Sequence, residues 1–167
     1  MSGAANFLKG IEGVTNYKYT SFEDMISILK STQILLSPYP INDIYFKTRI
    51  ETRSKKTIKE CLDCKSEIKY AIAGATRNVL ISSKIAPYIY SIRNNENGLL
   101  VNNKVDEWVN AIKYIYLNKN IHQKLIIEAN NDVLNRYSLD YAATKAIEIF
   151  NYIIDDFYTS HEVKIDI

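Results

Sequence analysis

The sequence predicts an α/β domain, in which a parallel sheet of three to four strands is followed by C-terminal helices. Short apolar runs, typical of buried strands, occur at residues 33–37, 79–83 and 99–101. Segments whose apolar residues recur at helical spacing lie between and after these runs. Strands that alternate with helices form a parallel sheet with both faces covered. Because ligands bind outside the carboxyl ends of such strands, the loops after Ser37, Ser83 and Val101 are the expected site.

The N-terminal part begins with a loose lead-in over residues 1–13, where apolar residues show no period. Alternation over residues 14–19 predicts a short strand. Ser21 is a suitable N-cap for a helix that extends to about Ser31, because Glu23 and Asp24 follow in its first turn. The apolar face of this helix contains Phe22, Met25, Ile26 and Leu29. The next strand, 33–37, ends before Pro38.

Residues 39–64 show no helical or strand period and carry a basic run. Such a run could follow a nucleic-acid backbone or an anionic membrane, but Glu51 and Glu60 interrupt it and no amphipathic period accompanies it, which favours a solvated loop. The basic residues are Lys47, Arg49, Arg53, Lys55, Lys56 and Lys59.

A helix is expected over residues 66–76, before the strand at 79–83. Its apolar stripe consists of Ile68, Ala71, Ile72 and Ala75. Pro87 indicates a loop after that strand, and residues 94–98 form a turn at Gly98 before the strand at 99–101.

Three helices complete the prediction, over about 105–117, 121–135 and 139–157, with Ser138 as the cap of the third. Their apolar stripes are expected in the core. These stripes are Val105, Trp108, Val109, Ile112 and Tyr116 in the first helix, Ile121, Leu125, Ala129 and Val133 in the second, and Leu139, Ala142, Ala143, Ala146, Phe150, Ile153 and Phe157 in the third. The domain is therefore expected to cover 14–158, followed by a tail at 159–167.

Composition excludes several classes of protein. The chain has 167 residues, of which 47% are hydrophobic and 24% charged, as in a single globular domain. A net charge of +2 argues against a dedicated nucleic-acid binder. Two cysteines and no signal-like segment indicate a cytoplasmic protein. No apolar run has the roughly 20 residues that a membrane span needs.

The predicted helix start at Lys65-Ser66 is a candidate anion site. Free backbone N–H groups and the helix dipole attract a phosphate there, and Lys65 and Lys69 add positive charge. In the alternative interpretation, Ser66 is only an N-cap, Glu67 a first-turn acid, and the two lysines are solvated.

Redox, metal and triad chemistry have weaker support. Cys61 and Cys64 form a C-x-x-C pair, but no buried strand leads directly into it, and no second pair of zinc ligands accompanies it. His122 and His161 are isolated, so no metal site and no catalytic residue is assigned.

Several segments, taken together and in order, resemble the C-terminal, donor-binding half of a retaining GT-B fold glycosyltransferase, of the large family that includes many bacterial polysaccharide enzymes. Residues 92–101, IRNNENGLLV, resemble the family's acidic-G-x-N-G-L-L-V segment, and 105–112, VDEWVNAI, resemble its "EEWAEAL" helix. Residues 133–139, VLNRYSL, resemble the joint before the last helix. Residues 65–70, KSEIKY, and 86–88, APY, resemble a subgroup with a K-S-x-x-K helix start and a P-Y loop.

The resemblance implies a Rossmann-like domain that binds a nucleoside-diphosphate sugar, with no further cofactor, for transfer to a glycan or lipid-linked acceptor. By the same resemblance, Lys65, Ser66 and Lys69 would contact the donor diphosphate, with Tyr88 as a further candidate. Two family glutamates are replaced, by Cys64 and by Ile72, of which Ile72 cannot bind a ribose hydroxyl.

A complete enzyme of this fold has two such domains, so the chain would be a donor-domain segment without turnover of its own. Its expected partners are the nucleotide sugar and either a separate acceptor-domain chain or further copies of itself, at the inner face of the membrane. The alternative is a degenerate, non-catalytic module that docks a partner chain.

Overall fold

The central feature of the computed structural model, which describes residues 12–15, 17, 20–39 and 62–160, is a three-stranded parallel sheet. Its strands, in spatial order, are β1 (Ile34–Ser37), β2 (Val79–Ser83) and β3 (Leu99–Val101). Leu35 pairs with Leu80, and Ser82 pairs with Leu100. The predicted α/β class, with a parallel sheet and C-terminal helices, is therefore confirmed, and the three strands are those expected at the three apolar runs.

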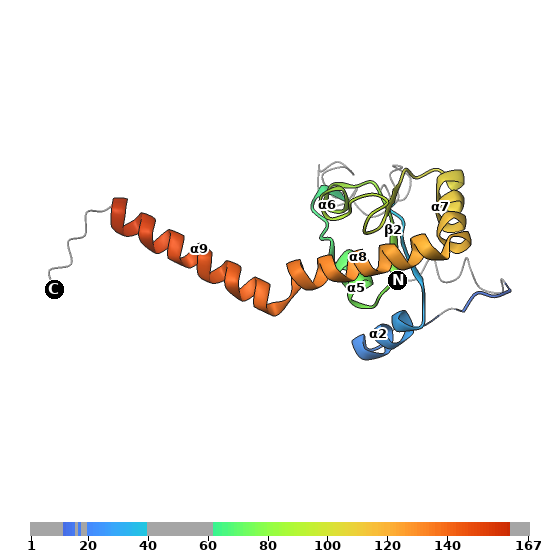
Figure 1. The fold of residues 1–167 in the computed structure, drawn as a ribbon, viewed down its shortest axis with the longest axis horizontal. Coiled ribbons are helices and arrows are strands. Elements are labelled where there is room, and N and C mark those ends of the chain that lie inside the picture. The colour runs from blue at the N-terminus through green and yellow to red at the C-terminus, as the bar shows by residue number, and fades with distance from the viewer. Residues whose placement is uncertain (1–11, 16, 18–19, 40–61, 161–167) are drawn as a thin grey trace, which may run out of the picture.

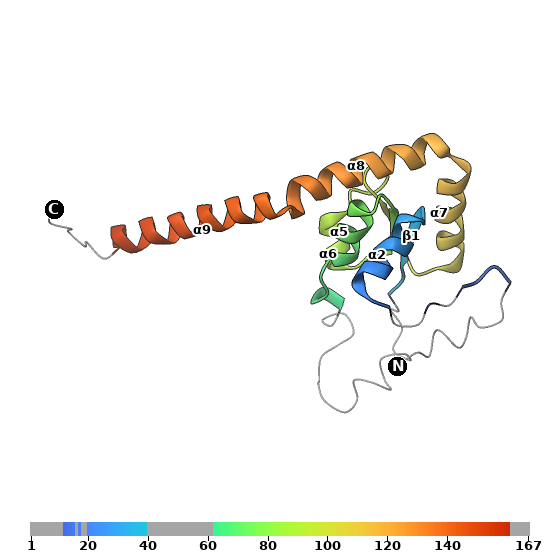
Figure 2. The ribbon, with the colours of Figure 1, turned by 90° about the horizontal axis from the view of Figure 1, so that it is seen from below.

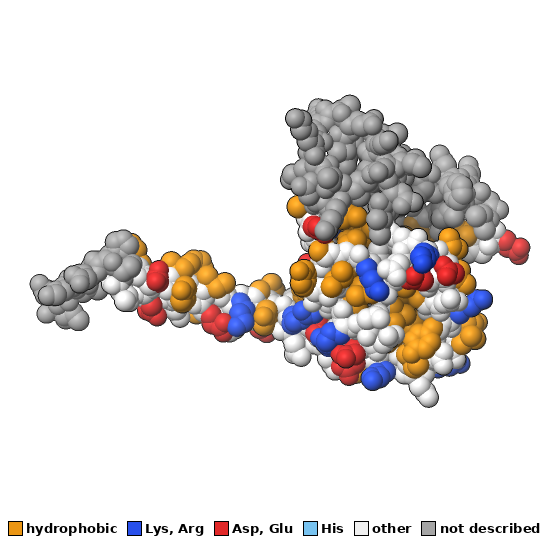
Figure 3. All heavy atoms as spheres, turned by 90° about the horizontal axis from the view of Figure 1, so that it is seen from above, with side chains coloured by type: hydrophobic (Ala, Val, Ile, Leu, Met, Phe, Trp, Pro, Cys, Tyr) orange, Lys and Arg blue, Asp and Glu red, His pale blue; other side chains and the backbone are white. Residues whose placement is uncertain are grey.

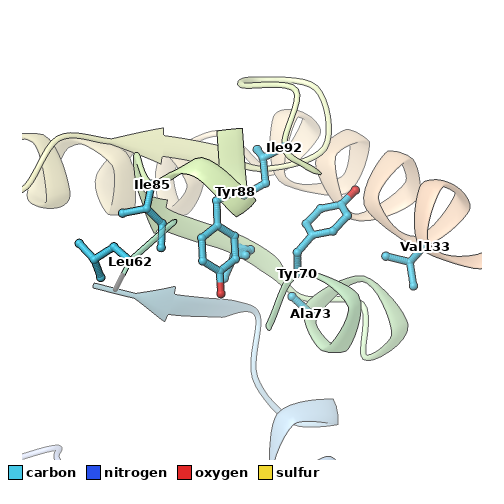
Figure 4. Close-up of a cluster of buried hydrophobic side chains, with 8 residues drawn as sticks. Leu62, Tyr70, Ala73, Ile85, Tyr88, Ile92 and Val133 are labelled. Atoms are coloured by element: carbon cyan, nitrogen blue, oxygen red, sulfur yellow. The ribbon is translucent and has the colours of Figure 1, made fainter. Parts of the chain in front are cut away.

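The middle strand, β2, divides the core into two clusters. All five of its residues are buried, and successive side chains point to opposite faces of the sheet. Leu80 packs with Tyr70, Tyr88 and Val133 on one face. Figure 4 shows Tyr70 and Tyr88 of this cluster between the sheet and the helices. Val79 and Ile81 pack on the other face, in a cluster with Leu99, Val101, Ile115 and Leu125.

The first described helix, α2 (Phe22–Lys30), begins as predicted. Ser21 is its N-cap, and its hydroxyl oxygen accepts a hydrogen bond from the N–H of Asp24 at 3.1 Å. At the other end, buried Asn78 donates to the carbonyl oxygen of Leu29 at 2.8 Å and accepts from the hydroxyl of Thr32 at 2.7 Å. The start of β2 thereby fixes the end of α2.

Two local predictions are wrong. Val14, Thr15 and Tyr17, the described residues of the stretch predicted as a strand, are exposed and belong to no strand. The loop expected at Pro87 is instead a short helix, α6 (Ala86–Ser91). Pro87 lies in its first turn, where the missing N–H costs nothing and the fixed φ suits a helix.

Helix α5 (Ile68–Ala75) occupies the predicted segment but buries a different face. It starts two residues later than expected, with Glu67 rather than Ser66 at the N-cap position. Its buried residues are Tyr70, Ala73 and Gly74, whereas Ile68 is 57% exposed. The small residues at 73 and 74 permit close packing against α8, so this face is buried in place of the predicted Ile68, Ala71, Ile72 and Ala75.

The last three helices are α7 (Val105–Leu117), α8 (Lys119–Tyr137) and α9 (Leu139–Ser160). Leu125, Ala129 and Val133 of α8 are buried, as predicted. On α7 the buried residue is Ile115, while Val105 and Tyr116, expected in the core, are exposed.

Helix α9 departs most from the expectation, because it projects away from the sheet (Figures 1 and 2). Ser138 caps it as predicted, and the N–H of Tyr141 donates to the Ser138 hydroxyl at 3.2 Å. All side chains at 139–159 are exposed, including the predicted apolar stripe. The reason is geometric: α9 continues the course of α8 beyond the edge of the sheet, which offers it no face. None of the helices described is long and apolar enough to cross a membrane.

Candidate functional site

Polar groups join the carboxyl ends of all three strands. The N–H of Tyr39, two residues after β1, donates to the hydroxyl oxygen of Ser83 at 2.8 Å. The Ser83 hydroxyl donates to the Asn103 side-chain oxygen at 2.6 Å, and the Asn103 amide donates to the carbonyl oxygen of Tyr39. The loops after Ser37, Ser83 and Val101 therefore meet, as the parallel arrangement predicts.

Tyr39 connects this edge of the sheet to the start of α5. The Lys69 ammonium lies over the Tyr39 ring, 4.8 Å from its centroid, which is a favourable cation–π distance. The Tyr39 hydroxyl lies 3.2 Å from that of Tyr88, and the two ring centroids are 5.8 Å apart. Lys69 is thus held beside the strand ends by an aromatic pair.

The two tyrosines of this pair ionise differently. Burial alone would raise the pKa of Tyr39, but the hydroxyls of Tyr88 and Ser37 and the charge of Lys69 together lower it below its ordinary value. Burial, reinforced by the hydrogen bond with Tyr39, raises the pKa of Tyr88 well above its ordinary value. Tyr39 is therefore the first of the two to lose its proton.

The other predicted phosphate contacts occupy different environments. Lys65 and Ser66 are exposed just before α5, and the N–H of Lys65 donates to the carbonyl oxygen of Leu62 at 3.1 Å. Tyr88 is fully buried, and its hydroxyl points toward β1 (Figure 4). The structure thus brings Lys69 and Tyr88 together through Tyr39, whereas Lys65 and Ser66 lie at the surface before the same helix.

Ser37, the last residue of β1, is also part of this edge. Its side chain is fully buried, and its hydroxyl oxygen has no hydrogen-bond partner of good geometry in the described part of the chain. Its carbonyl oxygen accepts a hydrogen bond from the Ser82 hydroxyl at 3.4 Å. The Ser37 hydroxyl lies close enough to the hydroxyls of Tyr39 and Tyr88 to exert a lowering effect on the pKa of each, so Ser37 belongs to the same polar cluster.

A second polar network holds α5 in place. The Tyr70 hydroxyl donates to a carboxylate oxygen of Asp132 at 2.5 Å and accepts from the Asn97 amide at 2.7 Å. Arg136 and Arg93 also donate to Asp132, Arg93 at 3.1 Å. Burial would raise the pKa of Asp132, but these donors hold it below its ordinary value.

This network ties α5, α8 and the turn at 94–98 into one unit. The Asn97 side chain also accepts a hydrogen bond from the N–H of Arg93 at 2.7 Å, which closes the turn. At the N-terminal end of α5, the Tyr137 hydroxyl donates to a Glu67 carboxylate oxygen at 3.4 Å. The start of α5 therefore contacts α8 through Tyr137 and the strand ends through Tyr39.

The Cys61-Cys64 pair remains without structural support as a redox or metal site. Cys64 is exposed, and Cys61 lies outside the described residues. The described ranges contain no group of three or more His, Cys, Asp or Glu side chains that could hold a metal ion. His122 is half-buried, and its Nε2 lies 3.3 Å from the carbonyl oxygen of Gln33. The basic run at 47–59 also lies outside the described residues.

Sequence reasoning missed Tyr39, Asn103 and Tyr137 as members of this region. Tyr39 and Asn103 each follow a predicted strand by two residues, so their position at the strand ends is the signal that would have identified them. Tyr137 lies at the end of α8, and only the packing of α8 on α5 brings it near Glu67.

No family model matches the chain, and no curated protein matches it significantly. Among solved structures, it is similar to a crystal structure of a glycosyltransferase from Rickettsia africae ESF-5, with 25% sequence identity and a TM-score of 0.47. The match covers 52% of this chain and 24% of that one, so the aligned part is about a quarter of the length of that glycosyltransferase.

Proposed function

We propose that this chain is the donor-binding segment of a retaining glycosyltransferase and holds a nucleoside-diphosphate sugar at the carboxyl edge of its sheet. The observation that carries the proposal is the position of the K-S-x-x-K segment. Its second lysine, Lys69, lies over Tyr39, which the hydrogen bond to Ser83 fixes at the ends of β1 and β2. Ligands of open parallel sheets bind at this edge.

In the proposed complex, the donor diphosphate lies against the start of α5. Lys65 and Lys69 offset its negative charge, and the Ser66 hydroxyl supplies a hydrogen bond. As the bond from the sugar to the diphosphate breaks, negative charge builds up on the departing diphosphate, and the two ammonium groups stabilise it. The buried Tyr88 acts indirectly, by positioning Tyr39 under Lys69.

We assign a donor site, and no acceptor site, to the described residues. A glycan or lipid-linked acceptor would be bound by another domain, either in the same protein or in a separate chain. We therefore expect nucleotide binding, but no glycosyl transfer, from residues 1–167 alone.

A second candidate function is that of a degenerate, non-catalytic module that docks a partner chain. Ile72, where the family has a ribose-binding glutamate, and the exposed apolar side chains of α9 favour it. The two candidates differ in one property, because only the first requires affinity for a nucleoside diphosphate.

Binding measured by titration calorimetry separates them. Uridine, guanosine and adenosine diphosphates and their sugars are titrated into the full chain and into Lys69→Ala and Lys65→Ala. Lys113→Ala on α7 is the matched control, since it removes the same charge from an exposed helix position. A charged hydrogen bond contributes about 1.5–3 kcal/mol, so each site variant should weaken binding about 10- to 100-fold. Absence of binding to every nucleotide, or equal binding by all four proteins, would contradict the proposal.

A further inference from the structure

Helix α9 carries an apolar seam that faces solvent along its whole length. The seam consists of Leu139, Ala143, Ala146, Phe150 and Ile153, which recur at alternating intervals of four and three residues, as in a coiled coil. Leu139 is 88% exposed and Phe150 is 64% exposed. In Figure 3, hydrophobic side chains line α9 where it leaves the rest of the protein. Exposed apolar surface of this extent marks an interaction site.

The charge of α9 argues against an anionic membrane as its partner. The helix contains four acidic residues and a single basic one, Lys145, which pairs with Glu148 on the polar side. Helices that bind anionic lipid surfaces instead carry lysine and arginine on their polar face. The acidic residues lie off the seam, so they leave it free to contact another protein.

The exposed area matches what a dimer needs. The seam is flanked by Ile147, Ile149 and Ile154, which are 59%, 57% and 49% exposed. A fully exposed large apolar side chain presents on the order of 200 Å², so the six large side chains of the seam and flanks offer roughly 700 Å² per copy. A standard interface buries about 800 Å² on each partner. Two copies of α9, each about 33 Å long, are therefore sufficient to form one.

The order of small and large residues also fits a second copy, in antiparallel orientation. The first half of the seam contains two alanines, and the second half contains Phe150 and Ile153. When two helices run in opposite directions, Phe150 of one faces Ala146 of the other, and Ile153 faces Ala143. Large side chains then fill the space above small ones, and the helix dipoles oppose each other favourably. A parallel pair would stack Phe150 on Phe150 and leave a gap at Ala146.

We propose that the protein forms a symmetric dimer through an antiparallel pair of α9 helices, with the two sheet domains at opposite ends. This interface is independent of the proposed donor site, which lies on the sheet. Because every seam side chain is exposed in the single chain, the seam can be mutated without disturbing the core.

The oligomeric state of the full chain tests the proposal. Light scattering after size exclusion, over a concentration series, should give twice the 19.2 kDa mass of one chain. Phe150→Glu and Ile153→Glu would place an unpaired charge in the interface and should raise the dimer dissociation constant on the order of 100-fold. Tyr152→Glu is the matched control: it adds the same charge on the opposite side of the same helix, at a residue 72% exposed, and should leave the dimer intact.

Disulfide trapping tests the orientation, in a Cys61→Ser, Cys64→Ser background. A mixture of Ala143→Cys and Ile153→Cys chains should form a mixed disulfide dimer, whereas each alone should not. Self-crosslinking of each variant alone would mean a parallel pair of helices and would overturn the antiparallel register.

A wild-type chain that stays monomeric up to about 0.1 mM, well above the micromolar affinity that standard interfaces reach, would overturn the dimer itself. So would a dimer that survives both glutamate substitutions.

Discussion

Gly74 provides a sharp test of how α5 is held, because it faces α8 at very short range. An added Cβ would lie 2.8 Å from the carbonyl oxygen of Ala129 and closer still to Cγ2 of Val133. The first of these neighbours is backbone and does not move without shifting α8. The carbonyl oxygen of Gly74 itself accepts a hydrogen bond from the Asn130 amide at 2.9 Å, so the two helices are also joined at this residue.

Two opposing effects decide the result of Gly74→Ala. Alanine is favoured over glycine in a helix by about 1 kcal/mol. Overpacking costs about 1–3 kcal/mol and more where backbone must move, so we expect a net destabilisation of about 2 kcal/mol. For a chain of this size, that corresponds to a fall of roughly 4–8 °C in the melting midpoint.

The assay is a thermal melt of Gly74→Ala, of Val133→Ala and of the double variant. Val133→Ala removes the crowding Cγ2 methyl group, so the double variant should be less destabilised than the sum of the two single variants, with a coupling of about 1 kcal/mol or more. A neutral or stabilising Gly74→Ala would show that α5 and α8 do not pack this closely at residue 74.

Three further predictions concern polar groups that are buried or half-buried. Asp132→Asn should destabilise the protein by about 1–3 kcal/mol at neutral pH. The folded state lowers the pKa of Asp132 from its ordinary 3.8. The ionised Asp132 therefore stabilises the protein above pH 3.8, and this stabilisation is lost as the pH falls below that value. Urea unfolding at several pH values should show this loss in the wild type and less of it in Asp132→Asn. Tyr39 should ionise below its ordinary pKa of 10.0. Tyr88→Phe should raise the pKa of Tyr39, because it removes a hydrogen bond to the Tyr39 phenolate. An absorbance titration, with Tyr39→Phe as the reference that lacks this group, would measure both values. Asn78→Ala should cost about 2–3 kcal/mol in urea unfolding, because it removes the hydrogen bonds of a buried amide to the carbonyl oxygen of Leu29 and to the side chains of Thr32 and Thr76.

The sheet was predictable because its strands leave strong local signals. The runs at 33–37, 79–83 and 99–101 are short, apolar and separated by helical spacing, and all three became strands within one residue of the predicted bounds. The N-cap at Ser21 and the buried positions of α8 depend on equally local chemistry. Helix α6 is not evident from the sequence, because proline is typical of loops as well as of the first turn of a helix.

Burial on α5 and α9 could not be predicted from periodicity, because it depends on the neighbouring elements. On α5 the less apolar face became buried, since Ala73 and Gly74 allow α8 to approach. On α9 a well-formed apolar stripe stayed exposed, since the chain had already passed the sheet.

The candidate site was predictable only in outline. The convergence of the strand ends follows from a parallel sheet, but the contacts that fix Tyr39 under Lys69 require the tertiary structure, because they join segments 30 or more residues apart in sequence.

The most direct test of the proposed donor site is a thermal melt of the full chain, with and without millimolar uridine, guanosine and adenosine diphosphates and their sugars. A ligand at 100 times its dissociation constant stabilises the native state by about 2.7 kcal/mol, equivalent to roughly 5–10 °C in the midpoint. We expect a rise of this order for one nucleotide over the others, and a smaller rise in Lys69→Ala. A cooperative melt whose midpoint no nucleotide changes would contradict the proposed donor site.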